Sequence, residues 1–446
     1  MSDTLISIVA FMGVLGVMIV VHEWGHYAAA KLLGVRVEVF SVGFGPRLLG
    51  FRRGETDYRI SAIPLGGYVK MSGENPMDER TDDPAEFMAH PRWHRFLIAI
   101  AGPFMNVVLA IGLLTAVYMK HYAMPVFFDQ PATLGWVEPD SAAAKVGLQA
   151  GDHITAIDGV QNPTWEQVFY KEVLSANQPL AVTAQRGAQA LSVTVVPEAV
   201  GIDRTGDAGW GADYPVRVTE LEHDMPAAQA GLRIGDEVTS VNGTSVRSLP
   251  AMLKVLQDGK GAPAELNVVR DGQPLKLSMQ PKLTPVEGTK ETLYRVGIRS
   301  NQEKVLALPV GEAFQKSIED NRKSSFMVLE LIEKLVQRKV SMRQMEGPLR
   351  IGQEAGKAAK KKGWIPLLQL MAAISLQLGL FNLLPIPILD GGMILFLFIE
   401  GLLRRDIALP IKERIYQVAF VFLVLFASAV LFNDVSKVFF SNGRLP

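Results

Sequence analysis

The sequence V-M-I-V-V-H-E-W-G-H-Y-A-A-A-K-L-L, residues 17–33, ends an apolar run that begins at residue 5 and is long enough to cross a membrane as a helix. It contains His22, Glu23 and His26. Ionisable side chains at membrane depth are costly to bury, and by default they mark a functional site. A secretory signal peptide also has an apolar core, but this segment lacks the basic residues that would precede one. We therefore expect a retained membrane-spanning helix that carries the chemistry of the protein.

The spacing of the polar residues in this helix indicates a metal site. His22 and His26 are four residues apart, so they project from one face of a helix and can bind a single zinc ion. Glu23 would lie beside the open position of the metal, where it can take a proton from water and deliver it to a leaving amine. This H-E-x-x-H spacing is typical of zinc metallopeptidases. The alternative is a hydrogen-bonded histidine pair in an ordinary helix, which leaves a costly buried Glu unexplained.

The composition favours a membrane protein of several domains. The chain has 446 residues, of which 48% are hydrophobic, and a mean hydropathy of +0.18. Its 45 basic and 45 acidic residues cancel, so nothing favours nucleic acid as a partner. It has no cysteine, which excludes disulfides and thiolate metal ligands but does not identify a redox compartment.

Four apolar segments are long enough to span a bilayer, at residues 5–33, 96–119, 364–384 and 415–432. Basic residues concentrate between the first and second segments and between the third and fourth, so the positive-inside rule places these two loops in the cytoplasm. Both termini and the long segment 120–363 should then lie outside. The lysines at 360–362 oppose this orientation, but long loops are translocated largely regardless of charge.

A glycine-rich segment between the first two spans predicts a β-hairpin. Residues 56–71 have the composition of two short strands around the turn Pro64-Leu65-Gly66-Gly67. This is either a plain cytoplasmic hairpin or an edge close to the metal, to which an extended substrate adds as a strand. In the second case, the residues that we expect to contact substrate are Tyr58, Ile60, Gly66, Gly67, Tyr68 and Met71.

The long external segment contains an internal repeat. The stretch from Ser141 to Gly159 aligns without gaps, at an offset of 84, with the stretch that ends at Gly243, and Arg186 and Arg270 keep this offset. Each copy predicts a short helix, a Gly-Asp turn, a strand and a second turn, a pattern that resembles the PDZ domains of bacterial periplasmic proteases. The pair either binds peptide ends or obstructs access; residues 133–136 are a candidate carboxylate-binding loop.

Two features follow the repeat. Apolar residues at helical spacing between 314 and 336 predict an amphipathic helix, which packs on neighbouring protein or lies on the outer leaflet. The third span then ends at Pro385 and Pro387, which must unwind it, and such irregular backbone is tolerated only where protein or a wet cavity surrounds it. Asp390 follows and would be the third metal ligand, although it could instead cap a helix that begins at Gly391. The metal role is favoured because Asp390 and the two histidines end their spans on the same side.

These motifs together resemble the site-2 protease family of intramembrane zinc metalloproteases. The resemblance covers nearly the whole chain and is carried by the PDZ repeat and by residues 22–26, 66–71, 102–106 and 382–392. It implies Zn²⁺ as cofactor, His22, His26 and Asp390 as its ligands, Glu23 as the catalytic glutamate and Asn382 as a substrate-positioning residue. One departure is Met393, where relatives often carry a His that is not a ligand, so we expect little effect on the chemistry.

The expected fold is a polytopic α-helical membrane protein of about four transmembrane helices, with a membrane-associated β-hairpin and two inserted periplasmic PDZ domains of β-rich α+β type. The predicted boundaries are 1–125 and 363–446 for the membrane halves, 126–200 and 212–283 for the PDZ domains, and 284–362 for a linker with the amphipathic helix.

The resemblance also implies an activity and a location. It implies a zinc metalloendopeptidase of the bacterial inner membrane, a monomer in the lipid bilayer with its active site near the cytoplasmic side. Its substrates would be single-span membrane proteins, such as an anti-sigma factor whose external domain another protease has removed, and remnant signal peptides. The other class to consider is a membrane-anchored PDZ scaffold with a structural metal, which would need neither Glu23 nor an open coordination position.

Overall fold

The computed structural model describes residues 3–74, 83–200, 205–285, 292–300, 303–337, 347–361 and 363–440. They form two compact units. The first unit consists of the described residues within 1–122, 306–337 and 345–446. The second consists of the described residues within 123–305.

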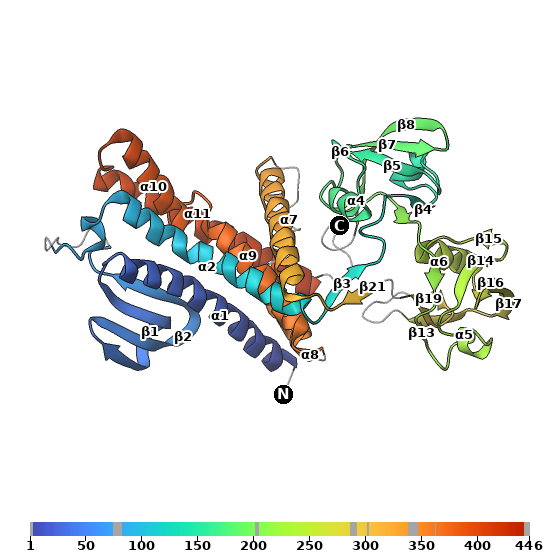
Figure 1. Cartoon of the computed structure of the whole chain (residues 1–446), viewed down its shortest axis with the longest axis horizontal. Helices are drawn as coiled ribbons and strands as arrows, with labels where there is room; N and C mark the ends of the chain where they lie inside the picture. Colours follow the sequence, from blue (N-terminus) through green and yellow to red (C-terminus); the bar gives the residue numbers. More distant parts are fainter. Residues whose placement is uncertain are drawn as a thin grey trace. The chain divides into compact units, whose positions relative to one another are not determined.

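The first unit is a bundle of helices with one small sheet (Figure 1). Its helices are α1 (Asp3–Leu32), η1 (Phe87–Ala89), α2 (Arg92–Tyr118), α7 (Val310–Val336), α8 (Pro348–Lys360), α9 (Ile365–Asn382), α10 (Asp390–Leu403) and α11 (Leu409–Phe440). Four described helices are long and apolar enough to cross a membrane, over Leu5–Leu32, Arg92–Tyr118, Ile365–Asn382 and Leu409–Ser436. They coincide with the four predicted segments, although the last one begins earlier than predicted.

The backbones of α1, α2 and α9 come into close contact at glycines. A Cβ atom on Gly25 of α1 would overlap the carbonyl of Ala101 in α2, and one on Gly379 of α9 would lie 2.9 Å from the Pro103 carbonyl. Small residues are what allow helices to approach this closely within a membrane. Helix α2 therefore packs between α1 and α9, and this contact is where the polar residues of all three helices meet.

The unwinding predicted at the two prolines is confirmed. Helix α9 ends at Asn382, a turn follows, and α10 begins at Asp390. Helix α10 was expected only in the alternative interpretation, in which Asp390 caps a helix that begins at Gly391. Its 14 residues are about 21 Å long, which is too short to cross a bilayer core of about 30 Å. Its Glu400 is buried and pairs with Lys412 of α11, with the Nζ and Oε1 atoms 2.5 Å apart.

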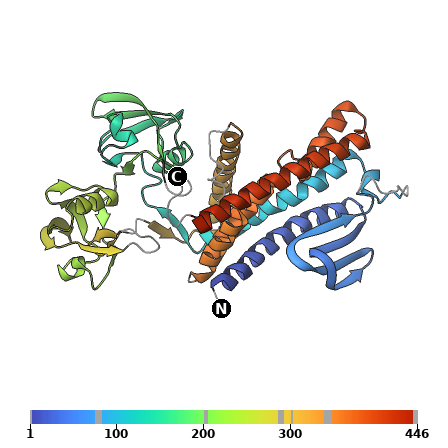
Figure 2. The ribbon, with the colours of Figure 1, turned by 180° about the vertical axis from the view of Figure 1, so that it is seen from behind.

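Asp434, near the end of α11, holds the start of α8. Its buried carboxylate accepts hydrogen bonds from the backbone N–H groups of Gly347, Leu349 and Arg350, at 2.9, 3.1 and 3.3 Å. A carboxylate at this position satisfies amides that have no partner within the helix and complements the helix dipole. Helix α8 packs in turn on α1, where Gly356 leaves no room for a Cβ atom beside Ser7. Figure 2 shows α11 in front of the helix bundle.

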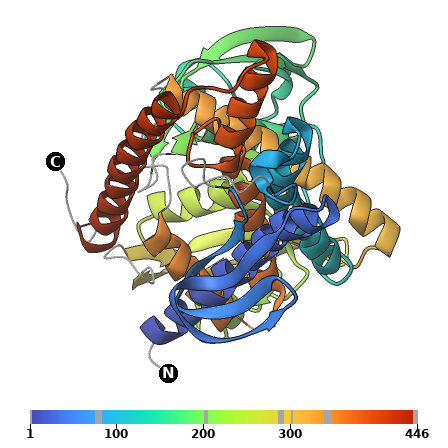
Figure 3. The same ribbon diagram turned by 90° about the vertical axis from the view of Figure 1, so that its left-hand side faces the viewer.

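The sheet between α1 and α2 differs from the predicted hairpin. Strand β1 (Val37–Arg53) pairs with β2 (Thr56–Met71), and the connecting turn lies at residues 54–55. The prediction of two strands around a turn at 64–67 is wrong, because β2 continues through these residues. Phe40 of β1 pairs with Val69 on one side and with Tyr58 on the other, so the two halves of β2 flank β1 instead of pairing with each other. The sheet lies alongside α1 (Figure 3).

The second unit contains two similar sheets, each with its own apolar core. The first has the strand order β6-β5-β7-β8 and the second the order β12-β14-β16-β17, with β15 paired to β14. The bounds of the first group are α3 (Ala142–Lys145), β5 (His153–Ile157), β6 (Val160–Gln161), α4 (Trp165–Val173), β7 (Leu180–Arg186) and β8 (Gln189–Val195). Those of the second are β12 (Val216–Arg217), α5 (Pro226–Gln229), β14 (Glu237–Val241), β15 (Thr244–Ser245), α6 (Leu249–Asp258), β16 (Ala264–Arg270) and β17 (Gln273–Met279).

The remaining short strands form pairs. They are β4 (Leu134–Val137) with β11 (Trp210–Ala212), β9 (Glu198–Val200) with β10 (Thr205–Asp207), β13 (Glu220–Leu221) with β20 (Ile298–Arg299), β18 (Lys282–Pro285) with β19 (Thr292–Arg295), and β3 (Tyr122–Pro125) with β21 (Glu303–Leu306). The first core includes Trp210 and the second includes Val296, which both follow the boundaries predicted for the repeats.

The sequence repeat is also a repeat of hydrogen bonds. Arg186 donates to both oxygens of buried Asp152, at 2.6 and 2.8 Å, and Arg270 does the same to Asp236, at 2.8 and 2.7 Å. The Arg270 guanidinium holds the pKa of Asp236 below its usual range. Because an ion pair with two hydrogen bonds recurs at the same offset as the turns and strands, the two sheets have the same local architecture, which fits the expected PDZ repeat.

Candidate metal centre

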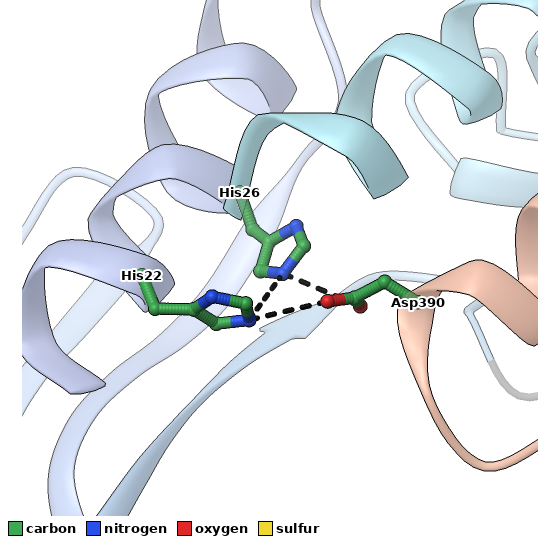
Figure 4. A group of neighbouring side chains, drawn as sticks. All are labelled: His22, His26 and Asp390. Carbon is green, nitrogen blue, oxygen red and sulfur yellow. Dashed lines mark hydrogen bonds and ion pairs between the residues drawn. The ribbon is translucent and has the colours of Figure 1, made fainter. Parts of the chain in front are cut away.

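Three predicted residues meet at the contact between α1 and α10 (Figure 4). The His22 and His26 Nε2 atoms lie 3.2 and 3.4 Å from the carboxylate oxygens of Asp390, and 3.2 Å from each other. One ligand atom from each residue lies within 4.8 Å of the others, which is close enough for one ion to reach all three. Both histidines are buried, with 7% and 9% of their surface exposed.

The donor set fits zinc. Two imidazole nitrogens and one carboxylate oxygen are the usual protein ligands of catalytic zinc sites, which keep a fourth position open. The alternative role for Asp390 was as a helix cap. In the structure the residue that caps α10 is Leu389, and Asp390 is the first residue inside the helix, with its carboxylate directed at the imidazoles. Its position therefore agrees with a metal ligand, and binding itself stays a prediction.

A backbone carbonyl orients His26. Its Nδ1 atom donates to the Ile98 carbonyl of α2 at 2.8 Å, which leaves the lone pair of Nε2 free for a metal. Gly102 lies against the same imidazole, where a Cβ atom would overlap Nε2.

Strand β2 holds the predicted catalytic glutamate. The Val69 N–H donates to Oε2 of Glu23 at 3.0 Å. Gly67 lies on the same edge, where a Cβ atom would be 3.4 Å from Cγ of Glu23 and 2.8 Å from the Ser41 carbonyl. The last residues of β2 pair with β1 on one side only. Their other edge lies beside Glu23 and faces the metal site.

The structure brings some of the other predicted contact residues to the site. The Nδ2 atom of Asn382, at the end of α9, is 3.3 Å from Nε2 of His22. Gly66 and Tyr68 pack on Phe44 of β1, and Tyr68 also receives a hydrogen bond from Arg59. These positions adjoin the Gly67 edge.

The remaining three residues lie differently, and Tyr58 and Ile60 are separated from the Gly67 edge by β1. Tyr58 bonds to the hydroxyl of Tyr27 at 2.5 Å, and Ile60 is 51% exposed on the sheet. Met71 is 5% exposed in the core beneath α1, and its N–H donates to Glu74, so it does not present a surface to a substrate as predicted.

Two further residues near the site were not assigned a role from the sequence. Asn106 of α2 lies 3.2 Å from Nδ1 of His22; it stood in the motif 102–106, and a polar residue within an apolar span was its signal. Glu74, just after β2, interacts electrostatically with His26, Glu23 and Asp390. No pattern in the sequence pointed to Glu74, because an acidic residue in a loop is ordinary.

A metal-ligand cluster on an apolar helix, with a glutamate held beside a strand edge, defines a membrane-embedded metallohydrolase. The sequence profile of peptidase family M50 matches residues 10–426. The chain therefore belongs to peptidase family M50, the site-2 proteases, and is a zinc metalloprotease of that type.

Named relatives are similar over their whole length. A Vibrio cholerae protein described as a zinc metalloprotease is 31% identical over 98% of this chain and 100% of its own. The regulator of sigma-E protease RseP of Salmonella typhimurium and that of Escherichia coli K12 are each 30% identical over 98% of this chain and 100% of their own. A PDZ domain of a Listeria monocytogenes protein covers 20% of the chain at 21% identity, with a TM-score of 0.16.

Proposed function

We propose that this protease hydrolyses peptide bonds of single-span membrane proteins within the bilayer. The observation that carries the proposal is the position of Glu23. It lies on a helix that is long and apolar enough to cross a membrane, between the metal-ligand cluster and the edge of β2. The names of the relatives refer to regulation of sigma-E. A single-span anti-sigma factor is the substrate that we propose for such a role, in a sigma-E stress response. Remnant signal peptides are a second substrate class of the same chemistry, because they too are single apolar helices.

His22, His26 and Asp390 would hold the zinc. When bound, zinc polarises the scissile carbonyl and makes water a nucleophile near neutral pH. Glu23 takes a proton from the attacking water and gives it to the leaving amine. The Val69 N–H fixes one oxygen of the Glu23 carboxylate and leaves the other free for this proton.

The strand edge at Gly67 and Val69 supplies the template for an extended substrate. A helical substrate hides its carbonyls in its own hydrogen bonds, so it must unwind before it is cut. An extended chain that adds to this edge would satisfy its backbone groups while it lies beside Glu23. The amide of Asn382 would hold the same segment from the opposite side, at the end of α9.

The orientation follows from the distribution of basic residues. We place the protein in the bacterial inner membrane as a monomer, with both termini and the PDZ repeat in the periplasm and the metal site near the cytoplasmic side. The PDZ repeat would then filter substrates by size, and an external domain would have to be removed before the membrane segment reaches the site. Binding of a peptide end by the repeat is the other possibility.

Cleavage by the purified, zinc-loaded protein tests this function. The protein is reconstituted with a single-span substrate, and the wild type is compared with Glu23→Gln and with the wild type plus a chelator. The near-isosteric Gln leaves the three ligands in place, so the variant should keep its zinc, while activity should fall by on the order of 10²–10⁴-fold. Activity of Glu23→Gln at the wild-type rate, with zinc retained, would show that Glu23 is not the base.

A further inference from the structure

The two histidines of the metal cluster differ in the group that contacts Nδ1, the ring nitrogen that faces away from the metal position. In both rings Nε2 points toward Asp390, so Nε2 must keep its lone pair for a metal and Nδ1 must carry the proton. For His26 this proton has an acceptor, because Nδ1 is 2.8 Å from the Ile98 carbonyl, which can only accept. His22 needs an equivalent acceptor on its own Nδ1 side.

Asn106 lies at that position. The amide of this α2 residue is 3.2 Å from Nδ1 of His22, and the residue is fully buried, with 0% of its surface exposed. Its Oδ1 atom has no hydrogen-bond partner among the residues that the structure describes. A buried carbonyl oxygen without a donor is costly, and a protonated Nδ1 facing the NH₂ group of an amide would set two donors against each other.

We propose that Asn106 is the positioning residue of His22, with Oδ1 accepting the Nδ1–H of the imidazole. A half-turn of the amide exchanges its oxygen and nitrogen without moving the rest of the side chain, and it brings Oδ1 to 3.2 Å from Nδ1. The hydrogen bond fixes the tautomer of His22 and the plane of its ring. Nε2 is then directed at the metal in the same way that the Ile98 carbonyl directs Nε2 of His26.

The backbone around Asn106 is itself held, which a positioning residue requires. The Ser375 hydroxyl of α9 donates to the Asn106 carbonyl at 2.8 Å. Gly379 lies one turn further along α9. A Cβ atom on Gly379 would be 3.3 Å from Cβ of Asn106, so the glycine lets α9 approach this residue closely. Asn106 is therefore fixed between α1 and α9, and the third helix of the bundle contributes to the orientation of a ligand on the first.

The test is zinc affinity, measured by competition with a chelator on the purified full-length protein. Asn106→Leu has a similar size but no acceptor, and it should weaken zinc binding by about 10–100-fold. Asn106→Asp keeps an oxygen at the same place and should restore most of the affinity. Gly112→Ala is the control, because it changes the same helix at a place where nothing lies within 4 Å of the added Cβ atom, and its zinc affinity should stay at the wild-type value.

Each outcome decides the proposal. Cobalt substitution adds a second readout, because a ligand ring that has lost its orientation changes the absorption spectrum of tetrahedral Co²⁺. Wild-type affinity in Asn106→Leu would overturn the proposal, and so would an Asn106→Asp variant as weak as Asn106→Leu, since an acceptor would then not be what matters. Equal losses in Asn106→Leu and Gly112→Ala would indicate a general disturbance of α2 and would also overturn it. The inference rests on the proposed zinc site, and a wild-type protein that binds no zinc would refute that site instead.

Discussion

Asp390 is the one carboxylate in the candidate metal cluster of the described residues. We expect about one zinc per chain in the wild type and a much lower content in Asp390→Ala, because two imidazoles cannot fix a tetrahedral site. The loss of zinc affinity should exceed the ~10–100-fold loss that is expected when a residue that only hydrogen-bonds to a ligand is replaced. Metal analysis of the purified proteins measures it, with Glu23→Gln as the control that keeps its zinc. Unchanged zinc in Asp390→Ala would remove this residue from the ligand set.

Glu172 at the end of α4 carries a pH dependence that is independent of catalysis. Burial, with a smaller effect of nearby Asp207, raises the pKa of its carboxyl to about 7, against the lowering effect of the hydrogen bond from the Ala208 N–H. Between pH 4.5 and about 7 the unfolded chain has lost this proton and the folded first repeat has kept it. The stability of this repeat should therefore fall as the pH rises through that window, by on the order of 3 kcal/mol.

Glu172→Gln should abolish this dependence, because Gln still accepts from Ala208 but does not titrate. Hydrogen exchange of the full-length protein, corrected for the intrinsic effect of pH, measures the protection of β5 and β7. At pH 8 the variant should be better protected than the wild type, and at pH 4 the two should agree. A variant that loses protection with pH as the wild type does would exclude Glu172 as the cause.

Sequence spacing indicated the roles of residues that are related within one helix or marked by irregular backbone, and it missed a role that depends on contact between two helices. His22, Glu23 and His26 are predictable because helical geometry relates them directly, and Asp390 because two prolines before it mark irregular backbone. Asn106 is 84 residues from His22 in the chain, and only the packing of α2 on α1 shows that they meet.

At the scale of the helices, the approach of α2 to α1 can be tested with two glycines of the same helix. A Cβ atom on Gly102 would overlap the His26 imidazole, whereas Gly112 has nothing within 4 Å of the place of its Cβ atom. Gly102→Ala should therefore displace His26 and lower both zinc content and activity by at least tenfold. Gly112→Ala should leave both unchanged, because an alanine there only improves helix propensity. Equal behaviour of the two variants would contradict the close approach at Gly102.

The elements that the sequence predicted are those formed by local patterns. The four spans follow from apolar length, and α7 (Val310–Val336) follows from apolar residues at helical spacing from 314 onward. The β1–β2 sheet was mispredicted because its pairing is not local. Residues 37–42 lie between two segments of β2, and glycines such as Gly43, with a φ of 93°, let β1 bend to reach both. Composition alone could not show which strand pairs with which.

For the whole molecule, the proposed filter predicts a gain of function on deletion. The strands β3 (122–125) and β21 (303–306) pair with each other, so the chain leaves and returns at neighbouring positions. After deletion of residues 126–283, the segment that begins at residue 284 can connect the two strands. The deleted segment contains nearly all of the two cores of the second unit and none of the metal cluster. We expect the shortened protease to cleave substrates with intact folded external domains, which the wild type should leave uncut.

Gel analysis of a tagged substrate, with and without its external domain, measures this gain. The trimmed substrate is the control, and both proteases should cut it at comparable rates. If the shortened protease still leaves the intact substrate uncut while it cuts the trimmed one, the repeat does not act as a size filter, and binding of a peptide end becomes the better account.

The hydrogen bonds from the start of α8 to Asp434 predict how the gene tolerates truncation. A nonsense mutation before codon 434 would remove the acceptor of three backbone amides at the start of α8. This helix packs on α1, which carries His22 and His26. Truncation before residue 434 is therefore expected to disturb the helix that carries the metal ligands, although the described part of α11 contributes no residue to the metal cluster.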